Sequence, residues 1–167
     1  MRLVLPLGIS ALLLVGCNSG LDQQSATKVM TSALTGTASA QAQFKPTNNN
    51  TNGSVDVTLT NPAGSGSAHV TGSATQTSNG WNVTFDITFA GWTDLATNVT
   101  LDGALHEAAS FTTMSPFVGD VKITGNVKAS GALQASVDFD VDASYSPTAV
   151  HVDGDVGGAS LKIDLGV

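Results

Sequence analysis

The chain has 167 residues, and its thirteen acidic side chains outnumber the six basic ones, which gives a net charge of −7 at pH 7. Arg2 is the single arginine, and an acidic chain is repelled by phosphate backbones, so the composition excludes nucleic acid as a partner. Small and β-branched residues prevail over the few charged and aromatic ones, which favours β-structure with many turns.

The first residues have the pattern of an export signal. Arg2 supplies a positive charge, and residues 3–15 form an apolar run that is shorter than the about 20 residues of a membrane-spanning helix. The run ends in Leu14-Val15-Gly16-Cys17, and Cys17 is the only cysteine. A single cysteine cannot form a disulfide within the chain, so the fold must be held together by its core.

The segment Leu14-Val15-Gly16-Cys17 resembles the lipobox of bacterial lipoprotein precursors. The resemblance implies that residues 1–16 are a signal peptide, and that Cys17 carries a thioether-linked diacylglycerol and an amide-linked fatty acid such as palmitate. Two or three acyl chains, at about 0.8 kcal/mol for each buried CH₂ group, form an effectively permanent membrane anchor. An ordinary secretory signal is the alternative, but Val15-Gly16-Cys17 lacks the small-x-small pattern of its cleavage site. Lipid attachment at Cys17 is therefore expected.

The residue after the cysteine bears on localisation. In bacterial lipoproteins an aspartate at this position tends to retain the protein in the inner membrane, and this chain has Asn18 instead. The resemblance therefore implies a lipid-anchored protein of the cell envelope, delivered to the outer membrane where the host is Gram-negative. The membrane is its one expected partner, and a protein or apolar-ligand partner is left open.

The remaining chain, about 150 residues, suffices for one domain over residues 22–167, joined to Cys17 by a short tether over residues 17–21. Residues 22–44 predict a helix, because Val29, Met30, Ala33 and Leu34 recur at helical spacing and Asp22 stands at the N-cap position. Residues 45–54 are polar and predict a loop.

From residue 55 to the end, apolar and polar residues alternate with the period of a strand. Val83-Phe85-Ile87-Phe89 and Val137-Phe139-Val141 are the clearest runs. Turn signals such as Asn79-Gly80 and Gly157-Gly158 separate these runs. The predicted fold class is α+β, mainly β: an N-terminal helix packed on a curved antiparallel meander sheet of about eight strands.

Two turns predict the register of neighbouring strands. A two-residue turn at Asn79-Gly80 places Gly72 opposite Ile87, and one at Gly157-Gly158 places Gly154 opposite Leu161. Four glycines share the parity of the apolar residues in their strands and should point inward, which predicts strong sheet curvature or a close approach by the helix: Gly72, Gly103, Gly125 and Gly154.

Five aspartates near the C-terminus form an acidic face on neighbouring predicted strands: Asp138, Asp140, Asp142, Asp153 and Asp155. A turn over residues 145–148 places Asp140 opposite Asp153 and Asp138 opposite Asp155. Like charges in this position destabilise a sheet, which makes the five residues weak candidates for a Ca²⁺ site. Flat strand faces rarely bring together six oxygens, and Lys122 and Lys162 should lie beside these aspartates. We therefore expect a solvated face and no bound metal or other cofactor.

No catalytic motif is present. The three histidines, His69, His106 and His151, fall on different predicted strands, and His106-Glu107 has no second histidine at metalloprotease spacing. No G-x-S-x-G or S-x-x-K segment activates a serine. We expect no catalytic residues and no enzymatic activity.

The leading interpretation is a non-enzymatic, lipid-anchored envelope lipoprotein with a structural or binding role. One alternative is a carrier that encloses an apolar ligand in a cupped sheet. Another is a small transmembrane β-barrel, although the aromatic residues are too few for two interfacial girdles. A hydrolase with an unrecognised site is the last alternative.

Overall fold

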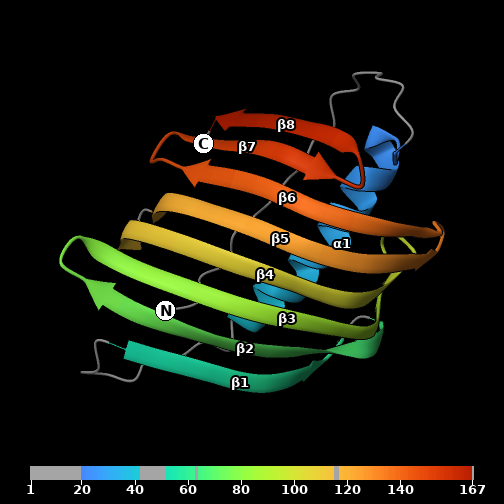
Figure 1. Cartoon of the computed structure of the whole chain (residues 1–167), viewed down its shortest axis with the longest axis horizontal. Helices are drawn as coiled ribbons and strands as arrows, with labels where there is room; N and C mark the ends of the chain where they lie inside the picture. The colour runs from blue at the N-terminus through green and yellow to red at the C-terminus, as the bar shows by residue number, and fades with distance from the viewer. Residues whose placement is uncertain (1–19, 42–51, 63, 115–116, 167) are drawn as a thin grey trace.

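A computed structural model describes residues 20–41, 52–62, 64–114 and 117–166. It contains one helix, α1 (Gln23–Gln41), and one sheet of eight strands in chain order, each antiparallel to the next. The expected α+β meander is thereby confirmed (Figure 1), and in the described part the sheet is open, with β1 and β8 as its edges. The strands are β1 (Asn52–Thr60), β2 (Ser65–Thr77), β3 (Gly80–Asp94), β4 (Val99–Met114), β5 (Phe117–Gly131), β6 (Ala135–Tyr145), β7 (Ala149–Val156) and β8 (Ala159–Gly166).

The boundaries near the N-terminus differ from the expected ones. The described helix ends at Gln41, and β1 begins at Asn52, so the last three residues of the predicted loop 45–54 belong to a strand. Residues 42–51, which hold the rest of that loop, lie outside the described residues, as do Cys17 and the predicted signal peptide. Leu21 of the predicted tether is already part of the fold, because its N–H donates a hydrogen bond to the Gly157 carbonyl at 2.9 Å.

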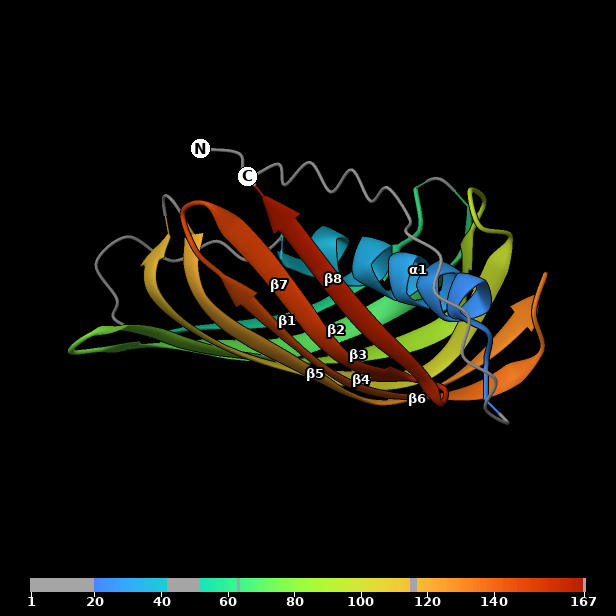
Figure 2. The same ribbon diagram turned by 90° about the horizontal axis from the view of Figure 1, so that it is seen from above.

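The sheet is strongly curved, and α1 lies on its concave side (Figure 2). The helix buries the stripe expected from its spacing, with Val29, Met30 and Ala33 inside and Leu34 partly buried against the same core. Gly36 gives the closest approach to the sheet, because a Cβ atom there would lie 2.5 Å from Cε1 of Phe89. The core is therefore a single layer between one helix and the concave sheet face.

Asp22 caps the helix as expected. The Ser25 N–H donates a hydrogen bond to Asp22 Oδ1 at 2.7 Å, and this bond holds the pKa of the Asp22 carboxyl below its usual range. The threonines and serines that weaken helix propensity donate their hydroxyl protons to carbonyls four residues back, as Thr27 does to Gln23. The cap and the buried stripe together define where the helix begins and which side it buries.

Replacing Asp22 by alanine should lower the melting temperature at pH 7, because the helix loses its N-cap acceptor. A lowered pKa in the folded state means that the carboxylate stabilises the fold above its unfolded pKa, and that this contribution is lost as the pH falls through the folded pKa. The melting difference between Asp22→Ala and the parent should therefore shrink below about pH 4. Asp22→Ser is the matched control and should retain most of the parent stability. A difference independent of pH would contradict the capping role.

One of the two predicted registers is confirmed and the other is wrong. Gly154 lies opposite Leu161 as expected from the Gly157-Gly158 turn. Gly72, however, lies opposite Phe85 and not Ile87, because Ser78 and Asn79 form the turn and Gly80 pairs with Thr77. Gly80 is needed in the strand, since a Cβ atom there would lie 1.7 Å from the Phe111 carbonyl oxygen of β4. Each residue of β2 therefore faces the β3 residue two positions before the predicted partner, and because the displacement is an even number, every side chain keeps its predicted face.

The inward glycines serve the curvature of the sheet. A Cβ atom on Gly125 would lie 2.4 Å from the Ala104 carbonyl oxygen of the neighbouring strand, with no helix atom among its three nearest contacts. Gly125 also has a positive φ of 138°, which side-chain-bearing residues rarely adopt. Of the two expected explanations, the structure supports curvature; the close approach of helix and sheet occurs at Gly36 instead. The same combination of positive φ and contact with neighbouring backbone occurs at Gly103 and Gly154.

Candidate functional site

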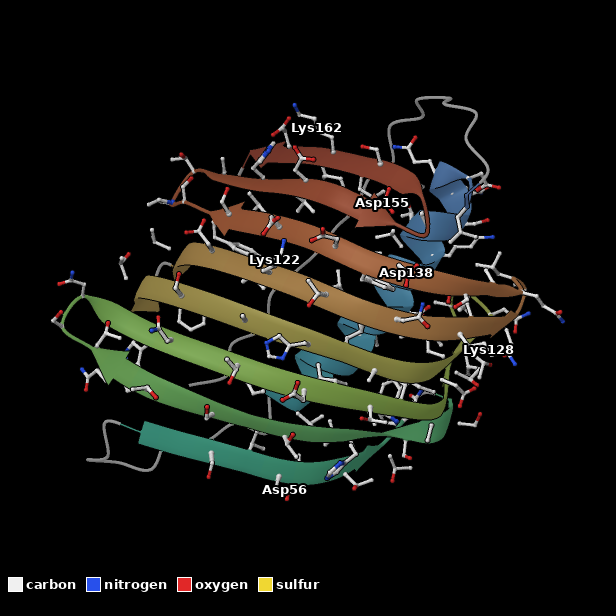
Figure 3. All side chains as sticks on the ribbon, viewed as in Figure 1. Asp56, Lys122, Lys128, Asp138, Asp155 and Lys162 are labelled. Atoms are coloured by element: carbon white, nitrogen blue, oxygen red, sulfur yellow. The ribbon has the colours of Figure 1, made fainter. Side chains whose placement is uncertain are left out.

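The two faces of the sheet differ completely in chemistry. The concave face carries the apolar residues of all the strands, and the convex face carries nearly all the charged ones. In Figure 3 the labelled charges Asp56, Lys122, Lys128, Asp138, Asp155 and Lys162 all belong to this convex face, on the side away from α1. The charged side chains of the sheet, apart from a few, are therefore displayed on the convex face.

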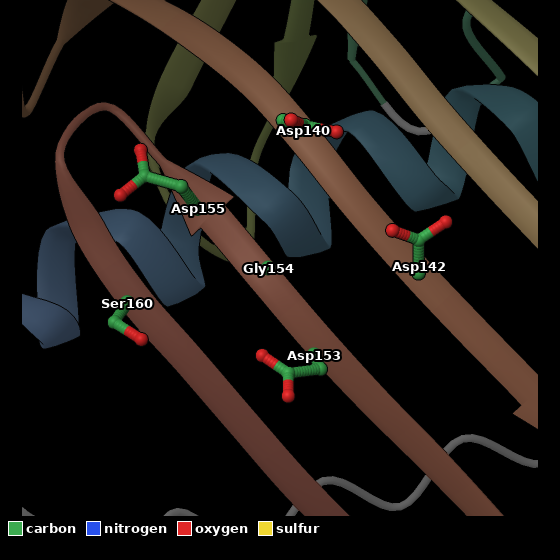
Figure 4. Close-up of a pocket in the computed structure, with 6 residues that line it drawn as sticks. All are labelled: Asp140, Asp142, Asp153, Gly154, Asp155 and Ser160. Atoms are coloured by element: carbon green, nitrogen blue, oxygen red, sulfur yellow. The ribbon is translucent and has the colours of Figure 1, made fainter.

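Four aspartates gather on the convex face of β6 and β7 (Figure 4). In register, Asp140 lies opposite Asp155 and Asp142 lies opposite Asp153. Together with Gly154 and Ser160 they line a shallow, open depression of about 440 Å³. We call these four aspartates the acidic patch.

The opposed pairs differ from the predicted ones. The turn between β6 and β7 was expected over residues 145–148, but Tyr145 pairs with Val150, which moves the turn one residue later. The Ser146 side chain fixes this turn, because its Oγ accepts a hydrogen bond from the Ala149 N–H at 3.0 Å and donates one to the Ala149 carbonyl at 3.1 Å. Asp138 consequently faces no carboxylate and accepts a hydrogen bond from Asn126 Nδ2 at 2.7 Å.

Most of the acidic patch is compensated by neighbouring donors. Lys122 Nζ donates to Asp140 Oδ1 at 2.7 Å and to Asp142 Oδ2 at 3.0 Å, and these two hydrogen bonds raise the pKa of the lysine. The Gly158 N–H donates to Asp155 Oδ1 at 2.7 Å. Asp153 lies opposite Lys162 as predicted. Among the described residues, no group of three or more His, Cys, Asp or Glu side chains has a geometry that could hold a metal ion.

Asp153 is the carboxylate of the acidic patch without a hydrogen bond among the described residues. Asp153→Asn should therefore raise the melting temperature slightly at low salt, because repulsion from Asp142 is relieved, and the gain should vanish at high salt. Asp155→Asn is the matched control and should show a smaller gain, since it replaces the charged acceptor of the Gly158 N–H by a neutral amide oxygen. Calcium should shift the melting temperature of the parent little. A calcium-dependent rise of several degrees that Asp153→Asn abolishes would instead establish a metal site.

Each of the three histidines pairs with an aspartate on an adjacent strand of the convex face. His69 Nε2 lies 2.9 Å from Asp56 Oδ1, and His106 Nδ1 lies 2.8 Å from Asp86 Oδ1. The third pair is His151 with Asp164. No described serine or threonine hydroxyl bonds to the free ring nitrogen of these histidines, so the pairs lack the nucleophile of a catalytic triad. They act as cross-strand contacts, two of them on the edge hairpins β1–β2 and β7–β8.

Glu107 is the functional candidate that the sequence interpretation missed. It is the only charged side chain among the buried residues of the described part, at 3 % exposure, on the concave face between Phe85 and Ile123 of the adjacent strands. Burial raises the pKa of the nearby Tyr145 phenol, and the negative charge of Glu107 adds to this shift. The sequence contained a signal for this position: Glu107 stands two residues after the apolar Leu105, so both side chains belong on the same face of the strand. A buried carboxylate on an otherwise apolar face is unusual and marks a place where function could reside.

Comparison with protein-family models, curated proteins and solved structures found no match to this chain. None of the described residues belongs to a helix long and apolar enough to cross a membrane. Cys17, the predicted lipid attachment site, is not among the described residues.

Proposed function

We propose that this chain is a lipid-anchored lipoprotein of the cell envelope, whose folded domain has a non-enzymatic structural or binding role. The observation that carries the proposal is the segment Leu14-Val15-Gly16-Cys17, with its unique cysteine at the end of an apolar run. The described elements agree with it, because cleavage before Cys17 removes no residue of α1 or of the eight strands that the structure describes.

The direct test is the variant Cys17→Ser, expressed in cells that are fed a clickable fatty acid. The parent should incorporate label and run at the size of the processed chain, whereas Cys17→Ser should stay unlabelled and unprocessed. Ser19→Ala is the matched control and should be labelled like the parent. Undiminished label in Cys17→Ser would refute the proposal.

Sorting gives a second test in a Gram-negative host. The chain with Asn18 should separate with the outer membrane on density fractionation, and Asn18→Asp should move it to the inner membrane. Asn18→Gln is the control without a new charge and should behave like the parent. Recovery of the parent solely with the inner membrane would contradict delivery to the outer membrane while leaving the lipid anchor intact.

A carrier of an apolar ligand is the second candidate, favoured by the concave face beyond the helix. At the end with the β2–β3 and β4–β5 turns, Trp81, Phe111 and Val121 are only partly buried against the core, and Glu107 lies on the same face. An apolar ligand with one polar group fits such a surface. Native mass spectrometry of the purified protein tests this: a retained lipid mass supports the carrier, and the unloaded mass alone argues against it.

A further inference from the structure

One end of the sheet lies next to the site where the chain enters the fold. The turns β1–β2, β3–β4, β5–β6 and β7–β8 all lie at this end, on the right in Figure 1, and we call it the anchor end. Three of the turns are linked to one another or to the adjoining strand end, since Asn61 Nδ2 donates to Thr93 O at 2.7 Å and the Ala132 N–H donates to Asn98 O at 2.8 Å. The β7–β8 turn is held to β6, because the Gly157 N–H donates to Asp138 O at 2.8 Å. The anchor end is thus a connected surface and not a set of independent loops.

The chain meets the anchor end at the β7–β8 turn. Leu21 bonds to Gly157, and Gly20 packs so closely on this turn that a Cβ atom there would lie 2.4 Å from the Gly157 carbonyl oxygen. Only Asn18 and Ser19 stand between Cys17 and Gly20. The three Cα–Cα steps from Gly20 to Cys17 reach at most about 11 Å, whatever path they take. A lipid on Cys17 therefore holds Gly20, and with it the β7–β8 turn of the anchor end, within about that distance of the bilayer.

The charge at the anchor end does not oppose contact with lipid. The turn residues 61–64, 95–98, 132–134 and 157–158 contain no charged side chain. Asp155, next to the β7–β8 turn, is engaged in this turn, because its Oδ1 accepts a hydrogen bond from the Gly158 N–H at 2.7 Å. Both carboxylate oxygens of Asp94, just before the β3–β4 turn, accept hydrogen bonds. Its Oδ1 accepts from the Ala96 N–H at 2.9 Å, and its Oδ2 accepts from the Ser32 and Thr97 hydroxyls. Asp22 is likewise engaged as the helix cap.

Leu95 projects from the anchor end. It is 68 % exposed and is the one large hydrophobic side chain of the described residues that is exposed. A single exposed leucine is ordinary by itself, and its position at the same end of the sheet as the start of the described chain is what gives it meaning. The turn that carries it is rigid, because the Asn98 N–H donates to Asp94 O at 2.8 Å and Ser32 of α1 lies 2.7 Å from the Thr97 hydroxyl. The backbone on either side of Leu95 is therefore held in place by hydrogen bonds, and the Leu95 side chain is exposed to solvent.

We propose that the anchor end docks on the lipid bilayer, with Leu95 inserted at the boundary between headgroups and acyl chains. This inference rests on the proposed lipid anchor at Cys17 and adds an orientation to it. The strands then rise from the membrane, the Ser146–Ala149 turn is far from it, and the acidic patch faces sideways, accessible to soluble partners.

The test uses the lipidated protein in vesicles of equal parts phosphatidylethanolamine and phosphatidylglycerol. Because the mature chain has no other thiol, Leu95→Cys and Thr148→Cys each offer one position for a polarity-sensitive fluorophore. Spin-labelled lipids should quench more than about half of the emission at position 95 and less than about a tenth at position 148, because interfacial insertion reaches about 5–10 Å. Equal quenching at the two positions would overturn the orientation.

A second pair of variants separates docking through Leu95 from simple tethering. The fluorophore is placed at Gln134→Cys, an exposed position of the β5–β6 turn at the same end. Adding Leu95→Ser should reduce the quenching at position 134 by about half, since the apolar contact with the interface is lost, and adding Ala96→Ser should leave it unchanged. Unchanged quenching with Leu95→Ser would refute the role of Leu95.

The parent protein distinguishes failure of this inference from failure of the anchor proposal. A lipidated Cys17 has no free thiol, so the parent should take up no fluorophore and should float with the vesicles. If the parent reacts and does not float, both proposals fall. If it floats unlabelled but positions 95 and 148 are quenched alike, the anchor proposal stands and the docked orientation is wrong.

Discussion

Gly125→Val should lower the free energy of unfolding by about 3 kcal/mol or more, since backbone strain of about 1–3 kcal/mol adds to a similar penalty for overpacking. Gly125 has a φ of 138°, and a Cβ atom there would lie 2.4 Å from Ala104 O and 3.0 Å from Leu105 Cα. Both atoms belong to backbone that is paired with β5, so neither can move without breaking the β4–β5 ladder. Denaturant unfolding of the parent and the variant measures the difference.

Gly91 provides the matched control. It also has a positive φ, 62°, but nothing lies within 4 Å of the position that its Cβ atom would take. Gly91→Val should therefore lose stability through backbone strain alone and remain more stable than Gly125→Val. If Gly125→Val were as stable as the parent, the better strand propensity of valine would outweigh the contact, and the glycine would reflect only the Gly-rich composition.

The face on which each strand residue lies could be predicted from the sequence, because it depends on parity alone. Apolar alternation places Phe85 and Val141 inside and Asp140 outside whatever the length of the turns. At the β2–β3 and β6–β7 turns each residue faces a partner two positions away from the predicted one, and a displacement of two preserves the face. The fold class therefore survived errors that changed every cross-strand partner in these two pairs.

Cross-strand partners depend on which residues form each turn. Local residue preferences alone do not reveal which of several possible turns will form. Ser146 sets the β6–β7 turn through its own hydroxyl, and Gly80 is withdrawn from the expected turn by its contact with Phe111 on a third strand. The second contact joins residues 31 positions apart and is visible only after the strands have been paired. The acidic patch was consequently predicted as a set of residues but with the wrong opposed pairs.

The candidate site residues likewise divide into those predicted by the alternation of apolar and polar residues and those that require the strand register. A three-residue loop over residues 130–132 predicted Lys122 beside Asp140, but the predicted register is wrong by two residues, and Lys122 lies opposite Asp142. Lys122 still compensates the acidic patch, because its Nζ bonds to both aspartates. The three histidine–aspartate pairs require the register of three hairpins and were not predicted. Glu107 was predictable from parity but was considered only as part of the dipeptide His106-Glu107. The search for short motifs therefore missed the buried position of Glu107, which the alternation of residues along the strand predicts.

Val29→Asp should be the most damaging change on the helix, because it buries a charge where only apolar side chains meet. Val29 is fully buried, and its turn of the helix packs on the concave face through Ala26 and Ala33. An unpaired charge in such a place destabilises a protein by about 3–5 kcal/mol. Because α1 supplies one whole side of the core, the loss should appear as a lower midpoint of a single unfolding transition, followed by circular dichroism and tryptophan fluorescence together.

Thr35→Asp is the matched control on the same helix, since Thr35 is exposed and a charge there stays in water. It should melt within about 1 °C of the parent, as surface substitutions change stability little. The transition of Val29→Asp must remain cooperative if the helix and the sheet form one unit. If instead the fluorescence transition, which reports on Trp81 and Trp92 of β3, kept the parent midpoint while the helical signal was lost, the sheet would be stable without α1. The concave face would then be free for an apolar ligand, and the carrier would become the better account of the domain.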